Sequence, residues 1–263
     1  MMYQIKDLHL SLPDMTRKPL LGSAPRIDIL KGLSFEVPKG AVIGIVGGSG
    51  SGKSTLGRTM LRLLEPTAGQ VVFDGTDITH LDEDSLRPMR RRFQMIFQDP
   101  MSSLNPRRRV RGIIAGPLRL HELETTGKVE EALDMVGLPR SFADRYPHEL
   151  SGGQRQRIGI ARAIALRPEF ILADEIVSGL DVSSQAQVLN LLEELVRDLG
   201  LTLAFISHDL SVIRRLCSHI IVLDQGKIVE TAETPTLFSS PQSAYTQELL
   251  QAIPLPDPDQ PWG

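Results

Sequence analysis

The pattern of hydrophobic and polar positions predicts short strands that alternate with helices. Apolar, β-branched runs that are typical of buried strands cover residues 41–46, 93–97, 170–173 and 201–207. A looser alternation over residues 3–12 predicts a strand at the start of the chain. Buried strands separated by helices are typical of a parallel sheet. The sequence therefore predicts an α/β protein.

Two further features predict how the rest of the chain is arranged around this sheet. Strand patterns at residues 27–37 and 70–75, and a hairpin pattern at 219–230, predict antiparallel strands beside the core. From about residue 110 to 150 the apolar positions keep helical spacing instead, which predicts an inserted helical segment.

The predicted division of the chain follows from these patterns. A core with an antiparallel β subdomain is expected at residues 1–98 and 158–235, and a helical subdomain at 99–157. Residues 236–263 form a C-terminal extension, and its tail from Pro254, rich in proline, is expected to be disordered.

Composition excludes several classes of protein. With 263 residues, 41% of them hydrophobic, the chain can bury a large core, and a net charge of −3 does not indicate nucleic acid as a partner. Cys217 is the single cysteine, so neither an internal disulfide nor a cysteine-built metal site is expected. No apolar run approaches the roughly 20 residues of a membrane-spanning helix, and residues 1–7 lack the apolar core of a signal peptide. We expect a soluble, cytoplasmic chain that reaches a membrane only through a partner.

A basic cluster lies before the strand predicted at residues 93–97. We expect it to form a solvated helix face, with a surface for phosphate or an acidic partner as the alternative. Its members are Arg87, Arg90, Arg91 and Arg92.

Residues 47–54 fit the pattern G-x-x-x-x-G-K-[ST] of a phosphate-binding loop, between a predicted buried strand and a predicted helix. Glycines let backbone N–H groups surround an anion, and the helix N-terminus adds partial positive charge. Lys53 is expected to reach the β- and γ-phosphates of a nucleotide and Ser54 to hold Mg²⁺. A flexible linker would not have these flanking elements. The predicted nucleotide-binding residues here are Gly47, Gly48, Ser49, Gly50, Ser51, Gly52, Lys53, Ser54 and Thr55.

Polar side chains follow other apolar strands of the predicted sheet. Ligands of open parallel sheets bind at the carboxyl ends of the strands, where Gln98, Asp174, Glu175 and His208 are expected. Asp174 is suited to Mg²⁺, and Glu175 to a water in line with the γ-phosphate. His208 is predicted to contact the γ-phosphate or orient that water. The alternatives are acids that are solvated or cap the next element, and an ordinary surface histidine.

A second glycine-containing helix start lies at residues 150–154. Ser151, Gly152, Gly153 and Gln154 open a predicted helix, which makes another site suited to an anion. A chain with one phosphate loop has no evident use for this site on its own nucleotide. We therefore predict that these residues complete the ATP site of a second copy of the chain or of a relative.

Taken in order, these motifs resemble those of the ATP-binding subunits of ABC transporters, over nearly the whole chain. The resemblance implies a P-loop (RecA-like) nucleotide-binding core with an antiparallel β subdomain and an inserted α-helical subdomain. It implies ATP and Mg²⁺ as cofactors, Glu175 as the catalytic carboxylate and His208 as the switch histidine. Gln98 resembles the glutamine that senses Mg²⁺ and the transmembrane partner, and residues 178–181 resemble the loop that links two ATP sites.

Residues 98–107 and 240–250 resemble the peptide, nickel and opine importer branch of that family. The branch implies a second, similar or identical ATPase, two transmembrane permease subunits and an external solute-binding protein, with no nucleic acid. It implies a peripheral position at the cytoplasmic face of the inner membrane. Import of a dipeptide or oligopeptide is predicted, with nickel, opine or glutathione import as alternatives. A weakly hydrolysing regulatory subunit and a soluble ABC ATPase outside transport are alternatives of other classes.

The chain departs from the family pattern at a few positions. Leu12 falls about where the family places an aromatic residue that stacks on adenine, and Ile176 replaces a proline after the catalytic carboxylate. Two alternatives stay open at Ile176: the backbone beside Glu175 is unchanged, or it is shifted and hydrolysis is slow, as in some subunits of unequal ATPase pairs. Gly48 replaces a commonly larger residue, and we expect no effect.

Overall fold

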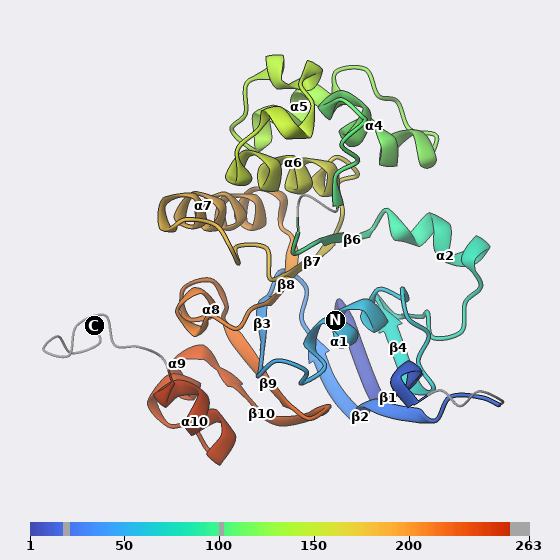
Figure 1. Ribbon diagram of the computed structural model, residues 1–263, viewed down its shortest axis with the longest axis vertical. Helices are drawn as coiled ribbons and strands as arrows, with labels where there is room; N and C mark the ends of the chain where they lie inside the picture. Colours follow the sequence, from blue (N-terminus) through green and yellow to red (C-terminus); the bar gives the residue numbers. More distant parts are fainter. Residues whose placement is uncertain (18–21, 100–102, 253–263) are drawn as a thin grey trace, which may run out of the picture.

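Two β-sheets and their covering helices form the part of the chain that the computed structural model describes, which is residues 1–17, 22–99 and 103–252 (Figure 1). The tail predicted to be disordered, from Pro254, lies outside these residues. None of the helices described is both long and apolar enough to cross a membrane.

The larger sheet has six strands in the order β10-β9-β3-β8-β7-β6. All neighbouring strands are parallel except β10, which pairs antiparallel with β9 at one edge. The carboxyl ends of β3, β6, β7 and β8 therefore meet at one edge of the sheet. The strands are β3 (Val42–Val46), β6 (Phe93–Ile96), β7 (Phe170–Asp174), β8 (Thr202–Ile206), β9 (His219–Asp224) and β10 (Lys227–Glu233).

The smaller sheet has four antiparallel strands in the order β2-β1-β4-β5. It covers one face of the larger sheet together with helix α1 (Lys53–Met60), and the two share a hydrophobic core. Its strands are β1 (Tyr3–Pro13), β2 (Arg26–Val37), β4 (Ala68–Phe73) and β5 (Thr76–Asp77).

Helices cover the opposite face of the larger sheet and extend above it as a separate helical region (Figure 1). Successive residues of the buried strands contribute to different cores, as Phe205 and Ile206 do, which explains their nearly continuous apolar sequence. The remaining helical elements are η1 (Met15–Arg17), α2 (Glu83–Arg90), α4 (Val110–Leu120), α5 (Lys128–Met135), η2 (Arg140–Asp144), η3 (Pro147–Glu149), α6 (Gly152–Ile164), α7 (Val182–Leu199), α8 (Leu210–Leu216), α9 (Thr234–Ser239) and α10 (Ala244–Gln251).

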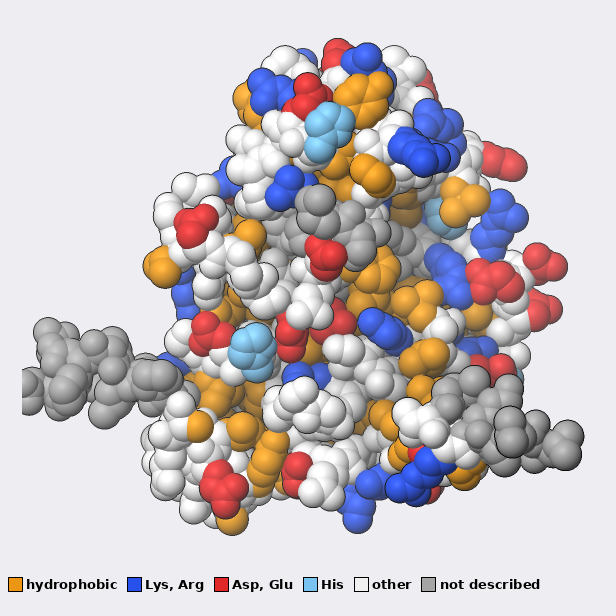
Figure 2. Space-filling view, in the orientation of Figure 1, with side chains coloured by type: hydrophobic (Ala, Val, Ile, Leu, Met, Phe, Trp, Pro, Cys, Tyr) orange, Lys and Arg blue, Asp and Glu red, His pale blue; other side chains and the backbone are white. Residues whose placement is uncertain are grey.

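The expectation of a solvated face for the arginine cluster is wrong for two of its members. Arg90 ends α2 with a side chain that is 23% exposed and pairs with Glu83 at 2.7 Å. Arg92 lies between Asp74 and Glu169 and hydrogen-bonds both carboxylates, with its guanidinium over the Phe73 ring. For Arg92, the acids come from distant parts of the chain. On the face drawn in Figure 2, basic and acidic side chains are interspersed.

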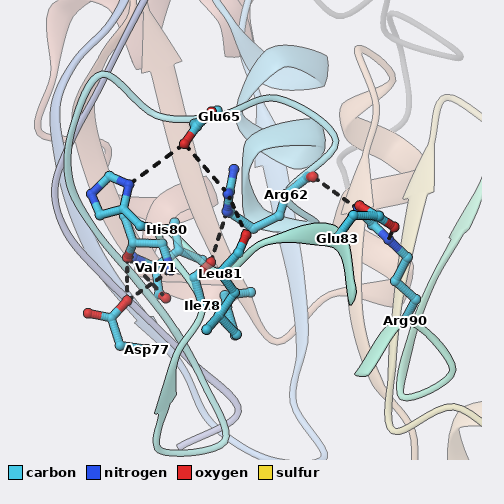
Figure 3. Close-up of polar contacts among 10 residues, drawn as sticks. Arg62, Glu65, Val71, Asp77, Ile78, His80, Leu81, Glu83 and Arg90 are labelled. Atoms are coloured by element: carbon cyan, nitrogen blue, oxygen red, sulfur yellow. Dashed lines mark hydrogen bonds and ion pairs between the residues drawn. The ribbon is translucent and has the colours of Figure 1, made fainter. Parts of the chain in front are cut away.

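Arg62 anchors the end of α1 to the segment that follows β5 (Figure 3). Its buried guanidinium donates from Nε to the carbonyl of Ile78 at 2.8 Å and from Nη2 to that of Leu81 at 3.3 Å. Arg90 donates to the carbonyls of Leu61 and Arg62 from the next helix. These contacts fix the helix that follows the phosphate-binding loop.

Candidate active site

The loop between β3 and α1 has the backbone that an anion cradle requires. Gly47, Gly50 and Gly52 have φ values of +150°, +77° and +103°, a region that side chains other than glycine rarely allow. At Gly47 an added Cβ would lie 2.1 Å from the carbonyl oxygen of Leu223, so the position admits no side chain. The hydroxyl of Ser51, inside the loop, is buried and has no hydrogen-bond partner among the residues that the structure describes. These features fit a loop that surrounds phosphate oxygens.

Lys53 begins α1 and folds back over the loop. Its Nζ donates to the carbonyls of Gly47 and Gly48, both at 2.8 Å. Burial lowers the pKa of this lysine, and the carboxylates of Glu175 and Asp174 oppose the shift. The ammonium group is thus held by carbonyl oxygens that a phosphate oxygen can replace.

Ser54 and Asp174 already form a pair. The Ser54 hydroxyl donates to Oδ1 of Asp174 at 3.0 Å, from α1 to the end of β7. Burial raises the pKa of Asp174; the Ser54 hydrogen bond opposes this rise and the charge of Glu175 adds to it. Within the described residues no three His, Cys, Asp or Glu side chains are grouped to hold a metal ion. One hydroxyl and one carboxylate suit Mg²⁺ that takes its other ligands from phosphates and water.

Glu175 directly follows β7, and two predicted site residues contact its carboxylate. Gln98 Nε2 donates to Oε2 at 2.8 Å, and His208 Nδ1 lies 3.4 Å from Oε1. The Glu175 carbonyl accepts the Ser178 hydroxyl at 2.7 Å, while the Glu175 N–H donates to the carbonyl of Ile206. Glu175 is therefore fixed through both its backbone and its side chain.

The cavity at this edge of the sheet has a volume of about 570 Å³. Residues of the loop line it together with Gln98, Glu175 and His208, while Asp174 is not among the lining residues. Ile29 from β2 also lines it, and sequence reasoning missed this residue because alternation along a strand does not say which end meets a loop. The lining residues are Ile29, Ser49, Gly50, Gly52, Lys53, Ser54, Thr55, Gln98, Glu175 and His208.

Leu12 does not line the cavity. Leu12 of β1 pairs with Ile27 of β2. Its side chain is partly buried against the core that the two sheets share, whereas Ile27 is 47% exposed. Ile29 is the apolar side chain that reaches the cavity instead.

The second glycine motif lies at the start of α6, apart from this cavity. Ser151 is the exposed N-cap: its Oγ accepts from the N–H of Gln154 at 3.3 Å, and Gln154 Oε1 accepts from the N–H of Ser151 at 3.0 Å. Gly152 and Gly153 form the first turn. None of these residues is in the cavity lining, so within the described chain they serve no part of this site.

Comparison with known proteins identifies the family. The family model described as ABC transporter matches residues 30–178, which include the phosphate loop, Gln98, residues 151–154, Asp174 and Glu175. The chain belongs to the ABC transporter family. The predicted family, the fold class and the class of activity, an ATPase, are confirmed.

Relatives in this family cover most of the chain. A putative peptide import ATP-binding protein of Brucella ovis is 50% identical over 93% of this chain and 82% of its own length. The oligopeptide transport ATP-binding protein AppF of Bacillus subtilis is 53% identical over 87% of this chain and 71% of its own length. An ATP-binding cassette solved as a post-hydrolysis dimer with ADP and phosphate superposes with a TM-score of 0.77 at 30% identity, over 89% of this chain and 99% of that one. The ABC family binds ATP, and the roles of individual residues stay predictions.

Proposed function

We propose that this chain is the ATP-hydrolysing subunit of an ABC importer that takes up dipeptides or oligopeptides. The observation that carries the proposal is the contact of Gln98 and His208 with both oxygens of Glu175, beside Lys53 in one cavity. The two relatives described above, whose names refer to peptide and oligopeptide transport, support the solute class. Nickel, opine and glutathione import remain the alternatives for the solute.

The chain's own residues have distinct tasks in this proposal. The loop amides and Lys53 bind the phosphates, with Lys53 exchanging loop carbonyls for phosphate oxygens. Ser54 and Asp174 hold Mg²⁺, which neutralises charge on the phosphates when bound. Glu175 orients the attacking water and accepts its proton, while Gln98 and His208 set the direction of the carboxylate.

The proposal includes partners. The exposed segment at residues 151–154 completes the ATP site of a second, similar or identical ATPase. The proposed complex has two permease subunits, and one of them docks on this chain beside β6, where Leu63 is 48% and Phe97 39% exposed around a groove of about 190 Å³. Hydrophobic side chains reach the surface between the helical region and the rest of this face (Figure 2). The complex holds the chain at the cytoplasmic face of the inner membrane and draws solute from an external binding protein.

The first test is ATP turnover of the complex, with its permeases in lipid, beside Glu175→Gln. We expect turnover to fall about 10²- to 10⁴-fold, because the amide cannot accept a proton, while ATP is still bound. Unchanged turnover would assign hydrolysis to the partner ATPase and make this chain the weakly hydrolysing regulatory subunit. Glu193→Gln is the matched control and should leave turnover unchanged, because Glu193 of α7 forms an exposed pair with Arg215 of α8.

The solute class needs a separate measurement. Proteoliposomes with the permeases and the binding protein are supplied with a dipeptide, an oligopeptide, a nickel chelate, an opine or glutathione. We expect peptide alone to stimulate turnover and to accumulate inside. Stimulation by another of these solutes would replace peptide in the proposal.

A further inference from the structure

The phosphate loop is hydrogen-bonded to the C-terminal extension. Tyr245, in the first turn of α10, accepts a hydrogen bond at Oη from the backbone N–H of Gly48, with an N···O distance of 2.8 Å. The two residues are 197 positions apart in sequence. The tyrosine side chain is partly buried against the hydrophobic core between the larger sheet and the helices that cover it. A helix outside the predicted ATP-binding core therefore reaches the loop directly.

The same peptide unit is held from both sides. The N–H of Gly48 and the carbonyl of Gly47 belong to one planar peptide group. Tyr245 binds its N–H, and Lys53 Nζ donates to its carbonyl oxygen at 2.8 Å. Rotation of this peptide would break both contacts at once, so the tyrosine hydroxyl also orients the carbonyl that holds the loop lysine.

The tyrosine is itself fixed from β10. Glu230 on that strand accepts the N–H of Gln242 at Oε1 and the N–H of Ser243 at Oε2, both at 2.9 Å. These amides lie at the entrance to α10, whose N-cap is Ser243. The edge strand of the larger sheet thus sets the position from which Tyr245 contacts the loop.

Gly48 is matched to this contact. Its backbone does not have a positive φ, so conformation alone does not demand glycine. An added Cβ would lie 3.0 Å from Tyr245 Oη, and among the described residues this is the one atom within 4 Å that it would meet. The tyrosine hydroxyl therefore limits the size of the side chain that residue 48 can carry.

We propose that Tyr245 is a positioning residue for ATP binding. Its hydroxyl holds the peptide group between Gly47 and Gly48 in the orientation that binds the nucleotide. The C-terminal extension then sets the affinity of the loop for nucleotide. The inference rests on the proposed use of this loop for ATP. Loss of one neutral hydrogen bond predicts weaker ATP binding by about three- to tenfold.

The test is Tyr245→Phe in the full chain, titrated with a fluorescent ATP analogue and assayed for ATP turnover in the complex. We expect Kd and KM to rise about three- to tenfold with kcat within about twofold, and the unfolding temperature without nucleotide to fall by no more than about 4 °C. Tyr146→Phe removes a phenolic hydroxyl from the helical region and should leave Kd unchanged. An unchanged Kd in Tyr245→Phe overturns the inference.

Gly48→Ala, made in the native chain and in the Tyr245→Phe chain, gives a second, independent readout. In the native chain the new methyl group meets Tyr245 Oη, whereas in Tyr245→Phe that oxygen is gone. We expect Gly48→Ala to weaken analogue binding more in the native chain than in the Tyr245→Phe chain. Additive effects overturn the inference. If the native chain itself fails to bind the analogue, the proposed function fails as well.

Discussion

At the scale of residues, the site contains a carboxylate that is buried although its charge favours water, and a residue with an unfavourable backbone conformation. Asp174 is 3% exposed, and Glu175 has a φ of +48°, a conformation uncommon for residues other than glycine. Ile176, 1% exposed, anchors the next position in the core. Such local costs are typical of residues that are held for function rather than for stability.

Asp174→Asn separates stability from function at one residue. Burial raises the pKa of Asp174, so the ionised carboxylate costs folding free energy near pH 7. We expect the nucleotide-free chain to gain about 0.5–2 kcal/mol in free energy of unfolding, because the amide carries no charge and still accepts from Ser54. The chain should also lose the stabilisation that ATP with Mg²⁺ confers.

Urea unfolding with and without ATP and Mg²⁺ measures both effects. Asp198→Asn, at an exposed surface pair, is the matched control and should change neither value. A destabilised nucleotide-free variant would show that the carboxylate is retained for folding.

At the scale of elements, the start of α6 has a structural role and a proposed functional one in the same residue. Ser151 caps the helix through its reciprocal bonds with Gln154, and it is exposed where a second chain can reach it. Capping alone explains a serine here. The two roles predict different results for a substitution that keeps the cap but adds charge.

Ser151→Asp should distinguish these roles. Aspartate is as good an N-cap as serine, so helix stability should be kept, whereas its charge repels the phosphates of the partner's nucleotide. We expect ATP turnover of the complex to fall at least about tenfold with the unfolding temperature unchanged. Ser151→Ala should instead cost about 1 kcal/mol of stability. If the aspartate variant turns over ATP normally, the motif acts as a helix cap only.

At the scale of the whole molecule, Arg92 joins the two sheets by polar contacts. It links Glu169, just before β7, to Asp74, just after β4, and lies over Phe73. Lys39 pairs with Asp74 from the other side at 2.6 Å. The antiparallel sheet and the nucleotide core are thereby held together beside their shared hydrophobic core.

Arg92→Ala should loosen this junction in a pH-dependent way. Hydrogen bonds from Arg92 lower the pKa of Glu169, and those from Lys39 and then Arg92 lower that of Asp74, with burial opposing both. A carboxylate with a lowered pKa in the folded chain stabilises the fold fully above its unfolded-state pKa, near pH 4. This contribution is lost as the pH falls from there through the lowered, folded-state pKa. We expect a loss of about 1 kcal/mol at pH 7, reduced by solvent screening because Glu169 is 42% exposed.

Denaturant unfolding at pH 7 and about pH 3 measures the difference between native chain and variant at each pH. The difference in free energy of unfolding should be smaller at the lower pH. What remains there is the cost of losing the packing of Arg92 on the Phe73 ring. Arg197→Ala, at a pair of exposed neighbours, should match the native chain at both. An equal difference at both pH values would rule out the ionic contribution.

How well each element and site residue could be predicted depended on whether a short stretch of sequence encodes it. The buried strands, the phosphate loop and the residues at the strand ends could be predicted, because period, glycine spacing and parallel pairing are encoded within short segments. Ile29, Arg92 and Tyr245 could not be assigned their contacts in this way. Each meets residues far away in sequence, and no local pattern states which distant strand or helix arrives beside it.

The sequence by itself determined the α/β class, the family and the polar residues that gather around Lys53 and Glu175. It did so because strand ends of a parallel sheet converge on one edge wherever the strands lie in the chain. Only the tertiary structure decided that α10 lies against the phosphate loop and that Arg92 joins the sheets. Those contacts depend on how whole elements pack, which is a property of complementary surfaces and not of any single segment.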